Sequence, residues 1–361
     1  MMLSAGNGFI MQSEKYSRDN AGQSLKKYIL LKKGELAYNH GASKAKQYGC
    51  CYELTEDEAR IPYVYHCFKV SGAEHTPYVA TALNNPKIDR QLKRLVSSSV
   101  RMDGLLNISF DDYMSVILHL PSLKEQTHIA DFLKKLDERI TAQEKLVASL
   151  KKHKRGLLRK VFAKLSDSCE KRNLKEVSVL FADGDWIESK DQALDGIRLI
   201  QTGNVGFGVY IDKTQNAKYI SETTFHRLNC LEIYDGDILI SRLPEPAGRA
   251  CLLPKSTERR ITAVDCTVIR TDSSVIDRNY LLQFLCSEQY LKTVNSFLAG
   301  GTRQRISRKN LEGIEVPYPS IDEQRYWGSF LCKVDARISN EEQRRSSLSR
   351  LRCFMLQQLF I

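Results

Sequence analysis

The chain carries the same helix opening twice, and this duplication limits the possible folds more than any other feature. LPSLKEQTHIADFLKKLDERI begins at Leu120, and YPSIDEQRYWGSFLCKVDARI begins at Tyr318, 198 residues later. The correspondence runs without a gap over residues 108–162, where seventeen of 55 positions are identical to the second copy. We therefore expect two similar structural units within one chain.

Each copy begins with a helix-start signal. A proline precedes Ser122 and Ser320, and glutamates follow three residues later, at Glu125 and Glu323. This is the spacing of a capping box, in which the serine hydroxyl accepts from the glutamate amide and the glutamate accepts from the serine amide. Both long helices are expected to start at these serines.

Apolar residues then recur at alternating spacings of four and three, which is typical of a coiled-coil seam. A helix of about forty residues spans roughly 60 Å, so much of each apolar stripe needs a second helix to cover it. The other copy is the obvious partner; the alternative is two unrelated amphipathic helices, each lying on its own domain. The predicted helix–helix seam comprises Ile129, Leu133, Leu136, Ile140, Val147, Leu150, Leu157, Val161, Trp327, Leu331, Val334, Ile338, Leu348, Met355 and Leu359.

The order of the segments predicts an antiparallel pair. Only a short polar linker, residues 166–173, follows the first long helix, and eight residues reach at most roughly 28 Å. The second globular segment is therefore expected to start near the far end of the first helix, and the second helix with it. This arrangement would place two globular units at opposite ends of a rigid rod.

The expected fold is α/β (α+β): two domains of mixed β-sheet and helices, separated by two long helices forming an antiparallel coiled coil, with a pseudo-two-fold internal repeat. In the second domain, β-branched runs predict strands within 235–241, 248–254 and 261–271, a helix over 277–298, and a Gly-rich basic loop at 299–307. Residues 32–39, 76–95 and 96–109 repeat that order loosely. The predicted segments are a first domain (1–118), a long helix (119–165), the linker (166–173), a second domain (174–316) and a second long helix (317–361).

Composition narrows the class of protein. The sequence contains no run of eighteen apolar residues, which argues against a membrane span. Its start has no basic n-region followed by an apolar stretch, which argues against a secretory signal. The ten cysteines form no C-x-x-C pair, which favours reduced cytoplasmic thiols over a zinc site or a disulfide framework. We expect no metal and no cofactor. The formal charge of +11 suggests a polyanionic partner such as nucleic acid.

With these features the chain resembles the specificity subunits of type I restriction-modification systems. The resemblance rests on GDILIS and GELAYN, on GGTRQRIS and MDGLLNIS, and on Pro-x-x-x-Glu-Gln opening a long helix twice. It implies two target recognition domains, each reading one half of a split double-stranded DNA site, with the paired helices setting the distance between the halves. It also implies docking of two methyltransferase subunits, joined by restriction and translocation subunits, and no chemistry in this chain. No G-x-x-x-x-G-K-[ST] loop is present.

One departure concerns the first domain. Residues 174–201 precede TGNVGFG in the second copy, whereas five residues precede the comparable GNGFI at Gly6. The first recognition domain is therefore expected to be N-terminally short, which leaves open a truncated or inactive specificity subunit, or self-association that supplies the missing part. A further alternative is a coiled-coil scaffold that binds DNA by charge alone. An enzyme fragment would need catalytic motifs that this chain lacks.

Candidate DNA contacts follow from side-chain chemistry. Base reading favours bidentate groups, whereas phosphate contacts need long cations on exposed loops. The alternative for each candidate is a solvated surface side chain, and the run 151–160 is expected to be mostly such a face. The candidates in the second domain are Gln201, Thr202, Asn204, Ser241, Arg242, Arg249, Gly300, Gly301, Thr302, Arg303, Gln304 and Arg305, and those in the first domain are Asn39, His40, Ser43, Lys44, Lys46 and Arg101.

Overall fold

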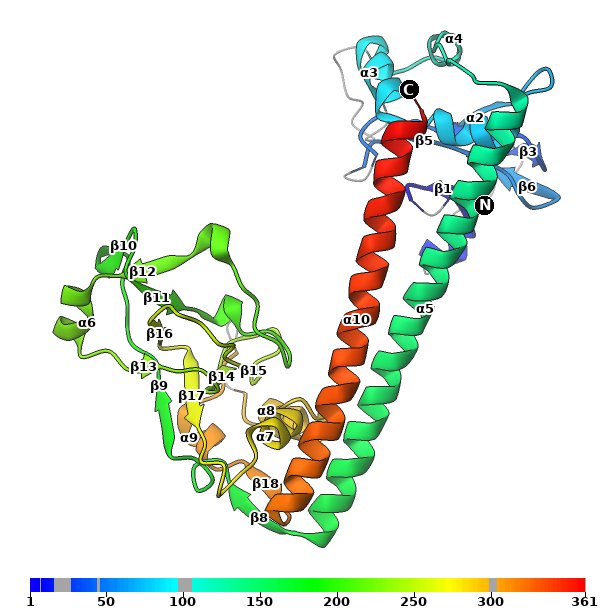
Figure 1. Ribbon diagram of the computed structural model, residues 1–361. Helices are drawn as coiled ribbons and strands as arrows, with labels where there is room; N and C mark the ends of the chain where they lie inside the picture. The colour runs from blue at the N-terminus through cyan, green and yellow to red at the C-terminus, as the bar shows by residue number, and fades with distance from the viewer. Residues whose placement is uncertain (7, 16–26, 44–45, 97–105, 299–303, 361) are drawn as a thin grey trace. The chain divides into compact units, whose positions relative to one another are not determined.

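The computed structural model describes residues 1–6, 8–15, 27–43, 46–96, 106–298 and 304–360. The chain divides into two compact units, Met1–Glu144 with Gln343–Ile361, and Lys145–Glu342. The long helices α5 (Leu123–Ser168) and α10 (Ile321–Leu359) each contribute one half to each unit (Figure 1).

The first unit combines small antiparallel sheets with short helices. Its strands form a β1–β2 hairpin, a β3–β6 pair and a three-stranded sheet in the order β5-β4-β7. Leu36 and Tyr38 of β4 pack in a core with Val79 and Leu92 from the helices. The elements are β1 (Met2–Ser4), β2 (Gly8–Ile10), α1 (Gln12–Lys15), β3 (Ile29–Lys32), β4 (Leu36–Asn39), β5 (Cys50–Glu53), β6 (Glu58–Ile61), β7 (His66–Phe68), α2 (Thr76–Ala82), α3 (Pro86–Leu95) and α4 (Phe110–Met114).

The second unit contains a five-stranded sheet in the order β10-β12-β11-β16-β13 and a four-stranded sheet in the order β15-β14-β17-β9. All four residues of β14 are buried. The elements are β8 (Glu170–Asn173), β9 (Leu180–Asp183), η2 (Ser189–Asp191), β10 (Gln192–Ala193), β11 (Ile197–Ile200), η3 (Thr202–Asn204), η4 (Thr214–Asn216), β12 (Lys218–Ile220), α6 (Glu222–Leu228), β13 (Glu232–Ile233), β14 (Ile238–Ser241), β15 (Ala250–Leu252), β16 (Arg260–Thr262), β17 (Cys266–Arg270), α7 (Arg278–Leu285), α8 (Glu288–Ser296), α9 (Arg308–Glu312) and β18 (Glu315–Tyr318).

The mixed α/β fold with two long helices that pack together is confirmed. GELAYN and GDILIS both form strands, as expected, and these strands, β4 and β14, each have a neighbouring strand on both sides. The expected helix over 277–298 is wrong in one respect, because α7 and α8 are separate helices. Ser287 accepts a hydrogen bond from the Tyr290 amide and caps α8, so its side chain competes with continuation of α7.

Residues 166–173 are not the linker expected from their polarity. Helix α5 continues to Ser168, and β8 then pairs antiparallel with β18, from Glu170 opposite Tyr318 to Asn173 opposite Glu315. Strand pairing satisfies the backbone groups of this segment and leaves Glu170 and Lys171 exposed, which explains why a strand can be built from polar residues.

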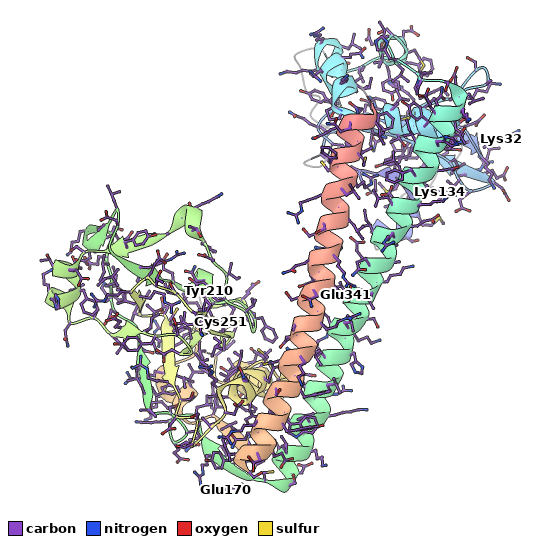
Figure 2. The ribbon with its side chains drawn as sticks, in the orientation of Figure 1. Lys32, Lys134, Glu170, Tyr210, Cys251 and Glu341 are labelled. Atoms are coloured by element: carbon purple, nitrogen blue, oxygen red, sulfur yellow. The ribbon has the colours of Figure 1, made fainter. Side chains whose placement is uncertain are left out.

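Within each unit the two long helices run antiparallel. In the first unit Arg352 pairs with Asp137, and in the second unit Lys154 pairs with Asp335 and Lys151 with Glu342. All fifteen predicted seam residues are buried or half-buried. Glu341, labelled on α10 in Figure 2, is also buried and pairs with Arg337 at 2.8 Å, so one seam position carries a charge.

The repeated Glu-Gln pair has a structural explanation. Ser122 and Glu125 exchange the hydrogen bonds of a capping box, and the Ser320 hydroxyl accepts from the Glu323 amide at 3.3 Å. The glutamine that follows each glutamate is fully buried. The side-chain oxygen of Gln126 accepts from the His75 amide at 3.0 Å, and its nitrogen donates to the Pro121 carbonyl at 2.9 Å.

Gln324 repeats this bridge with the same distances, accepting from the Asp277 amide and donating to the Pro319 carbonyl. His75 and Asp277 are the N-cap residues of α2 and α7. Each glutamine therefore joins the start of a long helix to the start of a domain helix in its own unit.

No helix in the described part of the chain has both the length and the apolar character needed to cross a bilayer.

Candidate nucleic-acid interface

A polar turn follows the buried strand β11 in the second unit. The side-chain oxygen of Asn204 accepts from the Gln201 amide at 3.0 Å, and its nitrogen donates to the Ile211 carbonyl at 2.9 Å. Asn204 is buried, and both ends of its amide are engaged within the chain. The structure therefore gives Asn204 the role of a loop brace rather than the base contact expected from its chemistry.

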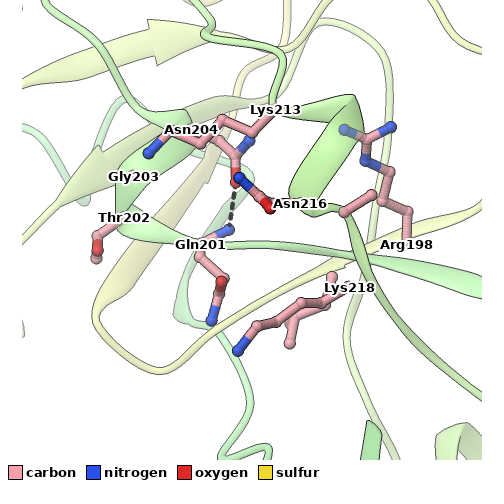
Figure 3. Close-up of a pocket in the computed structure, with 10 residues that line it drawn as sticks. Arg198, Gln201, Thr202, Gly203, Asn204, Lys213, Asn216 and Lys218 are labelled. Atoms are coloured by element: carbon pink, nitrogen blue, oxygen red, sulfur yellow. Dashed lines mark hydrogen bonds between the residues drawn. The ribbon is translucent and has the colours of Figure 1, made fainter. Parts of the chain in front are cut away.

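This turn borders a polar cavity of about 170 Å³ (Figure 3). Its described lining consists of Arg198, Leu199, Gln201, Thr202, Gly203, Asn204, Lys213, Asn216, Ala217 and Lys218. The predicted residues Gln201 and Thr202 are half-buried at its edge. The Lys213 ammonium lies over Gly203, 2.7 Å from where a Cβ would stand; because it is the end of a flexible side chain, this contact does not by itself require glycine.

The cations of the cavity fall into two classes. Arg198 is buried and bonds to Asp212 and Glu258, so its charge is neutralised within the unit. Lys213 and Lys218 are exposed, and neither has an ion-pair partner among the residues that the structure describes. These two lysines are therefore available to phosphate groups. Sequence reasoning missed them, although the polar, basic run KTQNAK at 213–218 could have indicated a contact loop.

Arg249, expected to contact DNA, instead holds two loops together. Its guanidinium donates to the carbonyls of Val205 (2.6 Å), Thr202 (2.8 Å), Leu243 (2.7 Å) and Pro246 (3.1 Å). Burial lowers the pKa of Arg249 from its ordinary value. With these four bonds made inward, Arg249 positions the loops around the cavity and is not free to read a base.

Ser241 and Arg242 are also directed inward, contrary to expectation. Ser241 is fully buried and donates to the Leu243 carbonyl at 3.2 Å. Arg242 is 4% exposed, donates to the Val264 carbonyl at 2.6 Å and lies 3.4 Å from Asp183. Ser241 is the last residue of β14 and Arg242 follows it directly, and both are buried in the unit.

The Gly-rich loop is described only at its C-terminal end. Gln304 and Arg305 are exposed, and Arg305 lies 3.8 Å from Asp265. The Ile306 amide donates to the Arg242 carbonyl at 3.2 Å, which fixes this end of the loop beside β14. The predicted contacts Gly300, Gly301, Thr302 and Arg303 lie outside the described residues.

In the first unit, the described candidates mostly bond within the chain. Asn39 donates to the Leu3 carbonyl at 3.3 Å and accepts from the Gly41 amide at 2.9 Å. Lys46 donates to the Asn84 carbonyl at 2.7 Å. His40 is buried, with its ring 5.0 Å from that of His66.

Ser43 is exposed and accepts from the Lys46 amide at 3.1 Å. Lys44 and Arg101 lie outside the described residues. A cavity of about 70 Å³ in this unit, beside α3, has one lysine in its lining, Lys87, and none of the predicted contacts.

Residues 167–350 match the family of the type I restriction modification DNA specificity domain. The chain is 23% identical over 273 residues to the type I restriction enzyme MjaVIII specificity subunit of Methanocaldococcus jannaschii, an alignment that covers 71% of this chain and 64% of that protein. The chain thus spans about two thirds of the length of this relative.

Two solved structures share the fold. A chain from the structure reported as "Structural basis underlying complex assembly and conformational transition of the type I R-M system" overlaps with a TM-score of 0.56 at 18% identity, covering 92% of this chain and 82% of that one. The type I restriction-modification system S subunit from M. genitalium overlaps with a TM-score of 0.54 at 17% identity, covering 91% and 83%.

Proposed function

Because the chain belongs to the type I restriction modification DNA specificity family, we propose that it is the non-catalytic subunit that selects the DNA target of such a complex. In this proposal each recognition domain reads one half of a bipartite site, and the chain docks the methyltransferase and restriction subunits. The observation that carries it is the pair of exposed lysines, Lys213 and Lys218, beside Gln201 and Thr202 on a braced turn.

The two kinds of side chain have different tasks. Lysines 213 and 218 are point charges suited to phosphate oxygens, which set the register of a protein on a duplex. Gln201 can pair with two atoms of an adenine edge. Arg249 and Asn204 hold the loops that carry these groups, so the contacts are preorganised before DNA arrives.

The duplicated helix starts suggest two equivalent surfaces, each suited to binding one copy of the same methyltransferase subunit. Phe132 on α5 is 44% exposed, and Phe330, at the equivalent position of α10, is 38% exposed. Tyr326 lies beside Phe330, with ring planes 9° apart and centroids at 6.4 Å. Exposed apolar side chains at equivalent positions of two units are suited to one kind of protein surface bound twice. Restriction and translocation subunits would then join through these partners.

The test uses the full chain with its methyltransferase partner. Methylation-sensitive sequencing of a host that expresses both identifies the target, and binding is then compared between that duplex and a scrambled one at physiological salt. We expect strong preference for the target. Lys213→Ala and Lys218→Ala should each weaken binding to both duplexes and reduce the salt slope by about one, whereas Gln201→Ala should reduce the preference.

Absence of any preference would contradict the proposal and favour the alternative of a scaffold that binds DNA by charge alone. A preference that appears only when two copies of the chain associate would favour self-association of the chain. Sedimentation of the complex with and without the target duplex distinguishes these outcomes. An exposed lysine away from the cavity, Lys152, supplies the matched control as Lys152→Ala.

A further inference from the structure

The loop that follows the Thr202–Asn204 turn carries apolar side chains on two faces, one packed inside the unit and one exposed. Val205 is buried and Tyr210 packs on the same apolar cluster, which includes Leu239 and Cys251; Tyr210 and Cys251 are labelled in Figure 2. Phe207, Val209 and Ile211 lie between or beside these inward residues and are 47%, 57% and 43% exposed. We name these three side chains the apolar ridge.

The loop that carries the apolar ridge has a fixed shape. The Gly206 amide donates to the Val209 carbonyl at 2.9 Å, and the Gly208 amide donates to the Ala250 carbonyl at 2.8 Å. Gly208 has a φ of 73°, a conformation that favours glycine, and a side chain there would meet the Cys286 sulfur at 3.1 Å. The turn is therefore seated on the body of the unit, and the ridge stands out from it.

The base of the loop is held equally well. The Ile211 amide donates to the Asn204 carbonyl at 2.8 Å, and the Asn204 side chain donates back to the Ile211 carbonyl. Arg249 binds the Val205 carbonyl on the other side. These bonds hold three apolar side chains in water although inward placement of the same residue types would stabilise the fold, which points to a contact made with a partner.

Duplex DNA is the partner that the surroundings favour. Asn204 is shared between the ridge loop and the cationic cavity, and Lys213 follows Ile211 by two residues. An isolated antiparallel bridge joins Val205 to Tyr210, so the loop is a narrow turn with its ends held together. The major groove admits elements as wide as an α-helix or a two-stranded ribbon. In the major groove, the apolar group that unmodified bases present is the C5-methyl group of thymine. An apolar side chain placed between two phosphate-binding lysines would therefore contact this methyl group.

We propose that the apolar ridge Phe207, Val209 and Ile211 contacts thymine methyl groups in the major groove of one half-site, while Lys213 and Lys218 hold neighbouring phosphates. This inference rests on the proposed function and adds the chemical group that the second domain selects. It makes Phe207, Val209 and Ile211 specificity-determining residues without any hydrogen bond to a base.

The test removes one methyl group at a time. The full chain is assembled with its methyltransferase partner, and target duplexes are prepared in which a single thymine is replaced by uracil. Burial of one methyl group corresponds to roughly a fourfold change in affinity. We expect a loss of that size at one or two thymines in the half-site read by the second domain, and no loss at thymines of the spacer.

Variants then connect the methyl group to the ridge. Phe207→Ala and Val209→Ala should weaken binding to the normal target and, in at least one of them, abolish the difference between thymine and uracil. Leu194→Ala provides the matched control, because Leu194 is an apolar residue of the same unit that is 98% exposed. Thermal unfolding checks that the variants fold, which the exposure of the ridge leads us to expect.

The inference would be overturned by a half-site without thymine, by uracil substitutions without effect, or by ridge variants that keep the full difference between thymine and uracil. Loss of methyltransferase assembly with unchanged DNA preference would also overturn it, in favour of protein docking. Failure of the proposed function is seen separately, since it would remove the preference of the unsubstituted complex for its target before any base is changed.

Discussion

Arg249 and Lys213 both lie beside the Thr202–Asn204 turn, yet their surroundings give them different tasks. Arg249 donates to four backbone carbonyls from two loops, whereas the Lys213 ammonium is exposed over Gly203. A guanidinium with several donors in a fixed plane is suited to joining carbonyls from different segments. At the scale of single residues, burial therefore separates the positioning cations from the binding cations.

Replacing Arg249 tests this division. Arg249→Ala leaves four carbonyls without their charged donor, so we expect a loss of about 2–4 kcal/mol of stability together with reduced target preference. Thermal unfolding and duplex binding measure the two effects. Arg155→Ala, an exposed arginine on α5, should change neither. Unaltered unfolding of the Arg249 variant would show that the loops do not depend on this clamp.

The cysteine thiols also differ in burial, and burial decides how reactive each thiol is. Burial raises the pKa of the Cys251 and Cys286 thiols to about 12 and that of Cys266 to about 11, whereas Cys353 is exposed. Because the thiolate is the reactive form, iodoacetamide at pH 7.5 should modify Cys353 first, and Cys353→Ser should remove the fast phase. Raising the pH to 9 should still leave the three buried thiols unmodified. Mass spectrometry of the native and unfolded chain checks the order.

At the scale of elements, the repeated glutamines show why a sequence motif is kept in both copies. Gln126 and Gln324 each bridge a prolyl carbonyl and the amide of the N-cap residue of a domain helix, with the same pair of distances. A long helix and its domain helix are thereby fixed to one another inside each unit. The antiparallel pairing of α5 and α10 then depends on apolar side chains such as Leu331, which is fully buried.

Gln324→Leu should destabilise the second unit. The substitution keeps a similar volume but leaves the Asp277 amide and the Pro319 carbonyl without this partner, at a cost of about 1–3 kcal/mol for each buried group. Denaturant unfolding followed by tryptophan fluorescence measures it, since Trp327 lies one turn away on α10. Gln358→Leu, on the exposed part of α10, is the control. Equal stability of the two variants would contradict the bridging role.

At the scale of the whole molecule, the chain consists of two α/β units, each containing one half of both long helices. This arrangement follows from the duplication, because each copy of the helix supplies the cover that the other needs. The expectation that the paired helices set the distance between two DNA half-sites stays a prediction, and it has a direct test.

Seven residues inserted into both helices, after Glu144 and after Glu342, would lengthen the pair by about 10.5 Å while preserving the seam. The spacer of the methylated site should then grow by about three base pairs, with both half-sites unchanged. Methylation-sensitive sequencing reads this result. The same insertion in one helix only should disrupt pairing and abolish methylation. An unchanged spacer in the double insertion would contradict the prediction that the paired helices set the distance between the half-sites.

Some features of this protein were determined by the sequence alone. The helix starts at Ser122 and Ser320, the apolar seam and the central strands at 36–39 and 238–241 depend on neighbours within a few residues, so motif and periodicity predict them. The break between α7 and α8 at Ser287 and the strand at 170–173 were missed, because a cap and a pairing edge overrode the local pattern.

The accessibility of the candidate DNA contacts depends on the tertiary structure. Asn204, Ser241, Arg242 and Arg249 have the chemistry of DNA contacts, but the first three are buried and Arg249 is half-buried. All four donate to backbone carbonyls of the chain, those of Ile211, Leu243, Val264 and Val205. Lys213 and Lys218 are exposed beside the same turn, with no ion-pair partner among the described residues. Residue type fixes which bonds a side chain can make, whereas burial by distant segments fixes whether those bonds are made inside the protein or remain for a partner.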